Sequence, residues 1–398
     1  MKRLWMTLAA AAFGAAAQAA DIYAQTDLSW KSAPPTLDPR ALKMNAGAKI
    51  PFLRPLPALR VGKTKCSSNN NPEWAMPGVF TGTDAALGQF METLRDTLTE
   101  NRRLIRIGGR TLVCNHNWVR DHTHQMKGWC HWERDNTSFL DFILDTQRAD
   151  GQFFELIKQW TDYHWTLVNP DCVRLYPDDA QTLVRLELEA DVEYLMVEGC
   201  LQTWRATGDD AWLRRALPRL EKGIDYQTRD PKRWDAAHGL CKRPYTIDTW
   251  DFLALAGGGD RRIDLDGPIA WGAAAILSAI DQGLAGIQDT DTLYRTMRFA
   301  PRWAVTEHVE GRYLTGYEVS KKKIDVRWTF KDAGFRYRLE CPSMRVDAHL
   351  LVPSGKRPAR LLVNGRATPF RLVDVFGSLY VDATVAPENG VADFEAFY

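Results

Sequence analysis

The sequence predicts a multidomain protein of the α plus β class, with a helical part followed by a smaller part made of strands. Between residues 85 and 284, apolar residues recur at helical spacing in several long segments. After about residue 298 the segments become short and rich in Val, Leu, Phe and Tyr. The chain has 398 residues, of which 45% are hydrophobic and 25% charged, which is typical of a soluble protein with a large core.

The first 20 residues have the pattern of a secretory signal peptide. Lys2 and Arg3 precede an apolar run from Leu4 to Ala17, which is too short to cross a bilayer. Ala17-Gln18-Ala19 fits a small-x-small cleavage site. We therefore expect a periplasmic or secreted protein without a membrane anchor.

The segment 21–84 is rich in Pro, Asn, Gly and Ser, and we interpret it as an extended stretch lying over the helical part. A helix is predicted over 85–103, where apolar residues recur at helical spacing: Leu87, Phe90, Met91, Leu94 and Leu98. A second helix is predicted over 137–147. The helical domain is expected to span 85–297.

The strongest helical pattern covers 180–206, and a second long helix is predicted over 210–228 after Gly208. Together they predict an antiparallel helical hairpin. A last apolar helix runs from Pro268 to Leu284. The pattern of the first helix rests on residues that step by three or four: Leu183, Leu186, Ala190, Tyr194, Val197, Leu201 and Trp204.

Residues 298–398 are predicted to form a C-terminal antiparallel β-sandwich. Asn364-Gly365 between two apolar runs is a strong hairpin signal. The strands are expected at 323–330, 335–341, 345–352, 359–363, 378–385 and 391–397.

Charge and cysteine content exclude several classes of function. With 51 basic and 50 acidic side chains, the chain lacks the cationic excess needed to bind nucleic acid. The seven cysteines contain no C-x-x-C, so a zinc ribbon or redox motif is not predicted. Because seven is odd, at least one cysteine is expected to stay unpaired within the chain. The 15 tryptophans exceed the 12 tyrosines, and indole faces suit sugar rings, although many must be core residues. No cofactor is expected, and the oligomeric state is left open.

The segment Cys114–His124 concentrates three histidines, a tryptophan and an Arg-Asp pair. A metal site is one interpretation, but the ligand spacing does not support it. A structural loop held by Arg120 and Asp121 is another. The functional interpretation is sugar binding by Trp118, Arg120, Asp121 and His122, with the indole stacking while the charged groups hydrogen bond to hydroxyls.

Acidic residues gather on one face of the predicted 180–206 helix. Glu187, Asp191 and Glu198 share one side, and Glu189 and Glu193 form a further pair. Like charges at this spacing disfavour an isolated helix. Either neighbouring arginines neutralise a solvated face, or carboxylates point into a cleft and bind substrate, for which Glu187 and Asp191 are the candidates.

The third candidate cluster runs from Lys242 to Phe252. Asp248 and Asp251 flank Trp250, and a carboxyl beside aromatic rings resists ionisation, as a general acid requires. We take Asp248 and Asp251 as candidate catalytic residues and Trp250 as a candidate sugar contact. The alternative is that Asp251 caps a helix or bonds to the backbone.

These motifs together resemble the six-hairpin, (α/α)6-toroid glycoside hydrolases, which include trehalases, glucosidases and α-L-rhamnosidases. The resemblance rests on five stretches: Asn117–Asp121, similar to a substrate-binding W-x-x-D loop; Phe139–Gln152, similar to a helix with a Q-x-x-D-G exit; Ala206–Leu220, similar to a TGD…LP hairpin; Thr249–Phe252, similar to a general-acid segment; and Phe299–Trp303, similar to an exit into a sandwich.

The resemblance implies an incomplete toroid followed by the sandwich, and hydrolysis of an oligosaccharide or polysaccharide by an inverting mechanism. Asp251 would be the acid, while Asp264 and Asp266 are the nearby carboxylates that could serve as base. Fewer helices are predicted than a full toroid has. The alternatives are therefore a catalytically inactive carbohydrate-binding relative or a poorly stable truncated product. A lyase or epimerase on a similar toroid is a further possibility.

Overall fold

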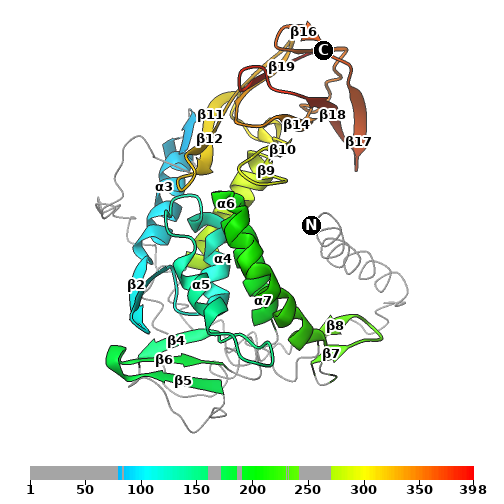
Figure 1. The fold of residues 1–398 in the computed structure, drawn as a ribbon. Helices are drawn as coiled ribbons and strands as arrows, with labels where there is room; N and C mark the ends of the chain where they lie inside the picture. Colours follow the sequence, from blue (N-terminus) through cyan, green and yellow to red (C-terminus); the bar gives the residue numbers. More distant parts are fainter. Residues whose placement is uncertain are drawn as a thin grey trace, which may run out of the picture. The chain divides into compact units, whose positions relative to one another are not determined.

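The computed structural model describes residues 79–82, 85–159, 172–185, 191–229, 231, 233–241 and 270–398 (Figure 1). The described helices and the two large sheets belong to one unit, formed by residues 65–235 and 241–398. Its helices and sheets make this an α plus β protein, as the sequence predicts. The predicted domain boundaries at 84 and 297 stay a prediction.

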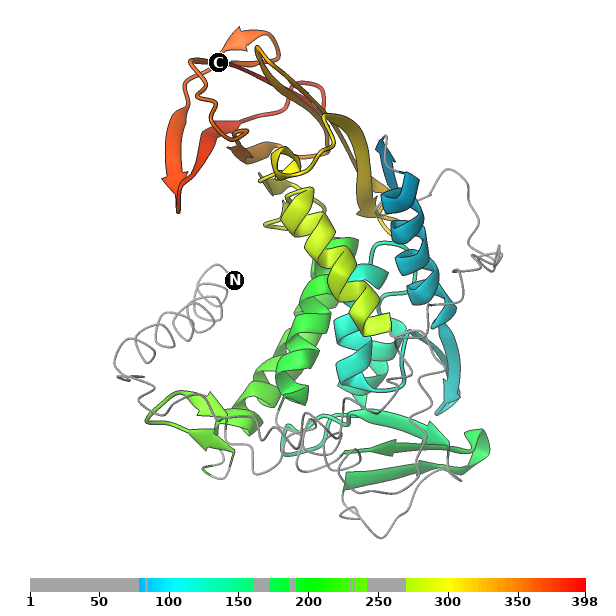
Figure 2. The ribbon, with the colours of Figure 1, turned by 180° about the vertical axis from the view of Figure 1, so that it is seen from behind.

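The described helices pack as a layer in which α9 crosses α4 and α3, while α4 lies beside α6 and α6 beside α7 (Figure 2). Close approach explains Gly128 of α4, since a Cβ there would lie 2.8 Å from Cδ1 of Leu98 and 3.3 Å from Cα of Ala274. The helices are α3 (Ala85–Glu100), α4 (Val119–Trp129), α5 (Ser138–Asp145), α6 (Val192–Thr207), α7 (Asp210–Arg229) and α9 (Ala270–Ser278), which continues as the π-helix η7 (Ala279–Leu284).

The hairpin of α6 and α7 forms as predicted. Gly208 ends α6 in the left-handed region at φ +68°, and its N–H donates to the carbonyl of Trp204. Asp209 then caps α7, because its carboxylate accepts the N–H of Trp212 at 2.8 Å. Trp212 and Leu213 bury the inner face of α7.

Two predictions for the helical part were wrong. The helix predicted over 180–206 begins only at Val192, because Gln181–Val184 form the strand β6. Leu183 fits a helical stripe, but pairing with the strands on either side buries it completely. Conversely, the segment interpreted as a W-x-x-D loop is largely the helix α4, starting at Val119.

Two large sheets follow in the C-terminal part. The seven-stranded sheet has the order β1-β11-β12-β13-β19-β15-β16, and the five-stranded sheet has the order β17-β18-β14-β10-β9. Their strands are β1 (Val79–Gly82), β9 (Ile287–Asp289), β10 (Thr296–Phe299), β11 (Glu310–Tyr317), β12 (Lys322–Lys331), β13 (Gly334–Glu340), β14 (Arg345–Leu351), β15 (Arg360–Val363), β16 (Arg366–Ala367), β17 (Arg371–Val375), β18 (Ser378–Val385) and β19 (Val391–Phe397).

The predicted strands correspond to β12, β13, β14, β15, β18 and β19 within two residues at each end. The Asn364-Gly365 hairpin also forms, with φ +50° and +76°, as a primed turn between β15 and β16 requires. Where the predicted strands pair with one another they are antiparallel, as expected, but β10, which was not predicted, pairs with β14 in parallel. In addition, β1 precedes every described helix and yet pairs with β11.

Helices and sheets contribute to a single hydrophobic cluster. It includes Met91 and Leu98 of α3, Ala274 of α9, and inward-facing residues of both large sheets. Within the cluster, Trp303 stacks on Trp328 with their ring centroids 4.1 Å apart and their planes inclined by 7°. This shared cluster fixes the helices against the sheets.

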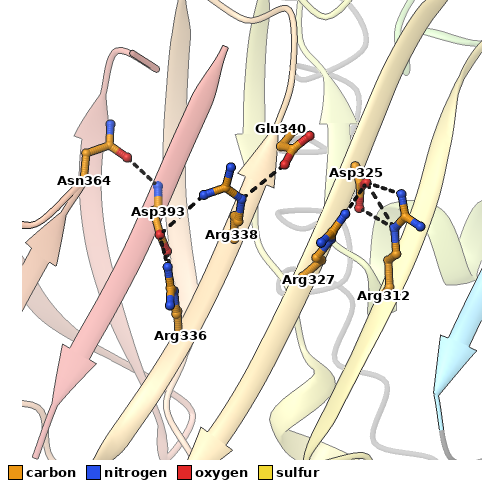
Figure 3. A network of polar contacts seen from close by, with 8 residues as sticks. All are labelled: Arg312, Asp325, Arg327, Arg336, Arg338, Glu340, Asn364 and Asp393. Carbon is orange, nitrogen blue, oxygen red and sulfur yellow. Dashed lines mark hydrogen bonds and ion pairs between the residues drawn. The ribbon is translucent and has the colours of Figure 1, made fainter. Parts of the chain in front are cut away.

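The opposite face of the seven-stranded sheet carries charge instead (Figure 3). Arg312, Arg327 and Arg338 are direct cross-strand partners, an arrangement that is repulsive by itself. Carboxylates between them offset the repulsion: Arg312 Nε donates to Asp325 at 2.9 Å, and Arg338 Nε donates to Glu340 at 3.1 Å. We call this set the charge ladder; its members are Arg312, Asp325, Arg327, Arg336, Arg338, Glu340, Asn364 and Asp393.

The remaining strands form small sheets beside the helices. The three-stranded sheet β4-β6-β5 adjoins the segment that precedes α4, through an isolated bridge between Trp118 and Leu156. These strands are β2 (Arg103–Ile107), β3 (Arg110–Cys114), β4 (Leu156–Gln159), β5 (Val173–Tyr176), β6 (Gln181–Val184), β7 (Trp234–Asp235) and β8 (Leu240–Cys241).

Candidate functional site

The first turn of α4 is held against the strand β4 by backbone hydrogen bonds. The N–H of Val119 donates to Glu155 O at 2.7 Å, and the N–H of Ile157 donates to Asn117 O at 3.0 Å. Trp118 occupies the N-cap position with an extended backbone and is partly buried. These bonds fix where the side chains of the following turn start.

A bidentate ion pair joins α4 to the start of α6. Arg120 donates from Nε to Asp191 Oδ2 at 3.0 Å and from Nη2 to Asp191 Oδ1 at 2.5 Å. The side chain of Arg120 is 13% exposed and that of Asp191 is 32% exposed. The fork geometry therefore fixes both groups at the border between protein and solvent.

Asp121 and His116 form the second polar pair at this end of α4. Nδ1 of His116 lies 3.8 Å from Oδ2 of Asp121 and accepts the N–H of Trp118 at 3.3 Å. Burial lowers the pKa of His116, although the nearby Asp121 carboxylate opposes that shift. A lowered pKa favours a neutral ring, which is the form that can accept this hydrogen bond.

The polar surface continues one turn further along both helices. Lys127 Nζ lies 3.2 Å from Glu198 Oε1 and 3.4 Å from Nδ1 of His124. Burial is the main cause that lowers the pKa of His124, and the charge of Lys127 adds to it. We call these groups the polar strip: His116, Trp118, Arg120, Asp121, His124, Lys127, Asp191, Tyr194 and Glu198.

Sequence reasoning missed part of this strip. Tyr194 was assigned to the buried stripe of its helix, but the structure leaves it 59% exposed. The signal was the spacing itself, since Arg120, His124 and Lys127 follow one another at helical intervals, as do Asp191, Tyr194 and Glu198. Recognising α4 as a helix would have placed the first three on one face.

The structure does not bring His122 into the strip. Its side chain is 1% exposed, its Nδ1 accepts the N–H of Asn115 at 3.3 Å, and its ring packs on Trp129 and Phe139. Burial lowers the pKa of His122 to about 3, and His116 adds to the shift. His122 is thus a neutral core residue that supports α4.

Beneath the strip lies a fully buried ion cluster. Arg185, which follows β6, lies 3.1 Å from Glu193 of α6 and 3.9 Å from Glu155, and all three side chains are at most 3% exposed. Desolvation lowers the pKa of Arg185, but Glu193 and Glu155 outweigh it, so the net pKa is raised. Glu193 also accepts the N–H of Phe153. The cluster thereby connects the small sheet to the first turn of α6.

Four of the predicted site residues lie outside the described residues: Glu187, Asp248, Trp250 and Asp251. Of the others, the structure brings Arg120 and Asp191 into contact and places Trp118 and Asp121 in the same turn. These assignments as substrate contacts stay predictions.

No described helix has the length and apolar character needed to cross a membrane. Within the same described residues, no group of three or more His, Cys, Asp or Glu side chains is arranged to hold a metal ion. The polar strip offers hydrogen-bonding and charged groups, with the indole of Trp118 at the N-cap of the same helix, and such groups can bind a polar, hydroxyl-rich molecule.

Comparison with known proteins gives distant structural similarity only. No family model and no curated protein sequence matches the chain. Solved structures similar to it include an α-L-rhamnosidase from Streptomyces avermitilis complexed with L-rhamnose, at 13% identity and TM-score 0.46. That match covers 80% of this chain and 42% of the other.

An α-L-rhamnosidase from Dictyoglumus thermophilum is similar at 11% identity and TM-score 0.39, over 81% of this chain and 50% of that one. A β-L-arabinofuranosidase from Geobacillus stearothermophilus T6 matches at 11% identity and TM-score 0.19, over 55% and 34% of the two chains. The chain thus spans half or less of each of these glycoside hydrolases. Similarity at this level does not define an activity, which must be argued from the side chains.

Proposed function

We propose that the protein is a secreted, carbohydrate-active protein of the glycoside hydrolase type, with the polar strip as part of its sugar-binding surface. The observation that carries this proposal is the Arg120–Asp191 fork, which joins the starts of two packed helices, with Trp118 at the N-cap of the first. A fixed guanidinium and carboxylate can bind vicinal hydroxyls, while an indole can cover the apolar face of a sugar ring.

In this proposal the helices form an incomplete toroid and the two large sheets form a β-sandwich. Hydrolysis would follow the inverting scheme, in which one carboxylic acid protonates the leaving oxygen and a second carboxylate activates water. Asp251 is the proposed acid, with Asp248 as the second candidate. Asp121, Arg120 and Trp118 are proposed to orient the sugar.

The test is product analysis after incubating the full chain with mixed oligosaccharides. Asp251→Asn is expected to abolish release of sugars while leaving the melting temperature unchanged. Asp332→Asn is the matched control, because Asp332 is an exposed carboxylate in the turn between β12 and β13. Undiminished turnover by the Asp251 variant would remove Asp251 from the mechanism.

A second variant tests the strip itself. Trp118→Ala is expected to raise KM, or Kd for a non-hydrolysed glycan, by about tenfold, because one stacked ring contributes on the order of 1–3 kcal/mol. Equal affinity of this variant and the native chain for every glycan tested would place the sugar elsewhere.

A catalytically inactive carbohydrate-binding protein is the second candidate. It is favoured by the state of the three carboxylates in the strip, since Asp191 is engaged by Arg120, Glu198 pairs with Lys127, and Asp121 lies beside His116. A carboxylate held by a guanidinium is a poor base for water. Glycan binding without any released or modified sugar would support this candidate, and a released monosaccharide would exclude it.

A further inference from the structure

A cavity of about 640 Å³ lies over the five-stranded sheet, on the side where Asp347 and His349 project away from the hydrophobic cluster. This volume falls within the range of about 300–1,000 Å³ that is typical of small-molecule sites. The lining residues are Thr290, Arg298, Asp347, Ala348, His349, Pro369, Phe370, Arg371, Asp382, Ala383 and Thr384.

Strand register places the polar lining residues in two rows across the sheet. In the first row, Asp347 of β14 is the partner of Arg298 on β10 and of Thr384 on β18. In the second row, Asp382 of β18 is the partner of His349 on β14 and of Arg371 on β17. Neighbouring strands are about 4.8 Å apart, so side chains from four strands converge over one patch.

Both carboxylates of this patch already have partners. Asp347 accepts hydrogen bonds from Arg345 at 3.0 Å and from the hydroxyl of Thr384 at 2.7 Å. Asp382 lies 2.5 Å from Nδ1 of His349 and 3.8 Å from Arg371. The acceptors of the cavity are therefore occupied by the protein itself.

The groups of the cavity that remain available to a ligand are nitrogen atoms, not carboxylates. Arg298 lines the cavity, is exposed, and makes no hydrogen bond or ion pair within the described part of the chain. Because the carboxylate of Asp382 can only accept, Nδ1 of His349 donates the hydrogen bond between them, which leaves Nε2 of the same ring for a hydrogen bond to a ligand. Tyr380 stacks on the His349 ring at 3.9 Å and 10°, which fixes its orientation.

We propose that this cavity binds a small hydroxy acid. The carboxylate of the ligand pairs with Arg298, one of its hydroxyls hydrogen bonds to Nε2 of His349, and Phe370 supplies an apolar wall. Arg371 lies on the far strand and offers a second cation. This binding does not depend on the polar strip or on glycoside cleavage, and sugar acids and non-sugar hydroxy acids share the required chemistry.

The test is calorimetric titration of the full chain with D-galacturonate and L-malate, with D-galactose, acetate and inorganic phosphate as comparisons. We expect at least one hydroxy acid to bind more tightly than all three comparison compounds. Tighter binding of D-galacturonate would indicate a sugar acid as the ligand, and tighter binding of L-malate a non-sugar hydroxy acid. Arg298→Ala should weaken that binding at least about tenfold, because the charge-assisted hydrogen bonds are lost. Arg357→Ala, an exposed arginine outside the cavity, should leave it unchanged.

A second variant separates the hydroxyl contact from the charge. His349→Phe keeps a ring over Tyr380 but removes Nε2, so affinity should fall towards that of acetate while acetate itself is little affected. The proposal is overturned if neither hydroxy acid binds, if galactose, acetate or phosphate binds as tightly, or if Arg298→Ala changes nothing.

Discussion

The buried ion cluster and the charge ladder use the same residue types in opposite surroundings. Arg185 and Glu193 are completely buried, whereas Arg336 is 51% exposed beside Asp393. In the buried cluster each charge depends on its partner, because water cannot replace it. In the ladder, solvent screens each pair, so the arrangement of neighbouring charges matters more than any single contact. The comparison indicates that the buried ion pairs contribute strongly to the stability of the helical part, whereas those on the sheet contribute little.

The largest effect is expected from Arg185→Met. This substitution leaves Glu193 and Glu155 buried without their guanidinium, and breaking a buried pair costs about 3–5 kcal/mol. Urea unfolding of the full chain measures the change. A loss below about 1 kcal/mol would mean that the buried cluster behaves like the ladder.

Arg120→Ala should come next, with a loss of about 1–2 kcal/mol, because its partner Asp191 is partly solvated. Thermal unfolding measures this loss. Arg120→Lys is the informative companion, since it keeps the charge but not the fork. If the lysine variant is as stable as the native chain, geometry is unimportant at this position.

A change of pH is expected to have a smaller effect on stability, and its sign should be opposite at Asp281 and Asp325. Burial raises the pKa of Asp281, which accepts the Tyr313 hydroxyl, so its ionisation disfavours the folded state. Burial also acts to raise the pKa of Asp325, but hydrogen bonds and charges from Arg312 and Arg327 outweigh it and the net pKa is lowered. Ionisation of Asp325 therefore favours the folded state.

The corresponding asparagine variants test these signs through melting temperature between pH 3 and 7. The stability of the native chain relative to Asp281→Asn should fall as pH rises from the ordinary carboxyl pKa to the raised one. Relative to Asp325→Asn it should rise as pH increases from the lowered pKa to the ordinary one. Parallel curves for the two variants would contradict the assignment of opposite shifts.

The smallest effect is expected from Arg336→Ala on the ladder. Its pair with Asp393 is half exposed, so the loss should stay below about 1 kcal/mol and shrink further in 1 M salt. Unfolding at low and high salt measures it. A loss comparable to that of Arg185→Met would show that the ladder acts as a cooperative network.

The sequence predicted those helices, strands and turns whose pattern can be recognised without knowing what they pack against. The helical pattern of α7, the short Val-, Phe- and Tyr-containing segments of β12 and β13, and the Asn364-Gly365 turn were all visible in the sequence. The helix α4 was missed because its buried face mixes Val119 and Met126 with polar residues such as Thr123. A stripe of that composition has little contrast with its exposed side.

Non-local contacts set the rest. Leu183 fits a helical stripe as well as it fits β6, and only pairing with β4 and β5 decides between them. The parallel pairing of β10 with β14 likewise has no local signal. The sequence identified Arg120, Asp121 and Asp191 of the strip as candidates. It could not predict that Arg120 and Asp191, which are 71 positions apart, form a bidentate ion pair.

The pairing of β1 with β11 bears on how the protein is made. Val79–Gly82 leave the ribosome before every described helix, yet their partner strand follows all of those helices in the chain. During synthesis the backbone N–H and C=O groups of β1 therefore stay without their β11 partners until the helical part has been completed. Long-range pairing of this kind is slow. We expect nascent chains that stop before residue 310 to aggregate or require chaperones, because β1 then has no partner strand and Phe80 lacks its contact with Trp328.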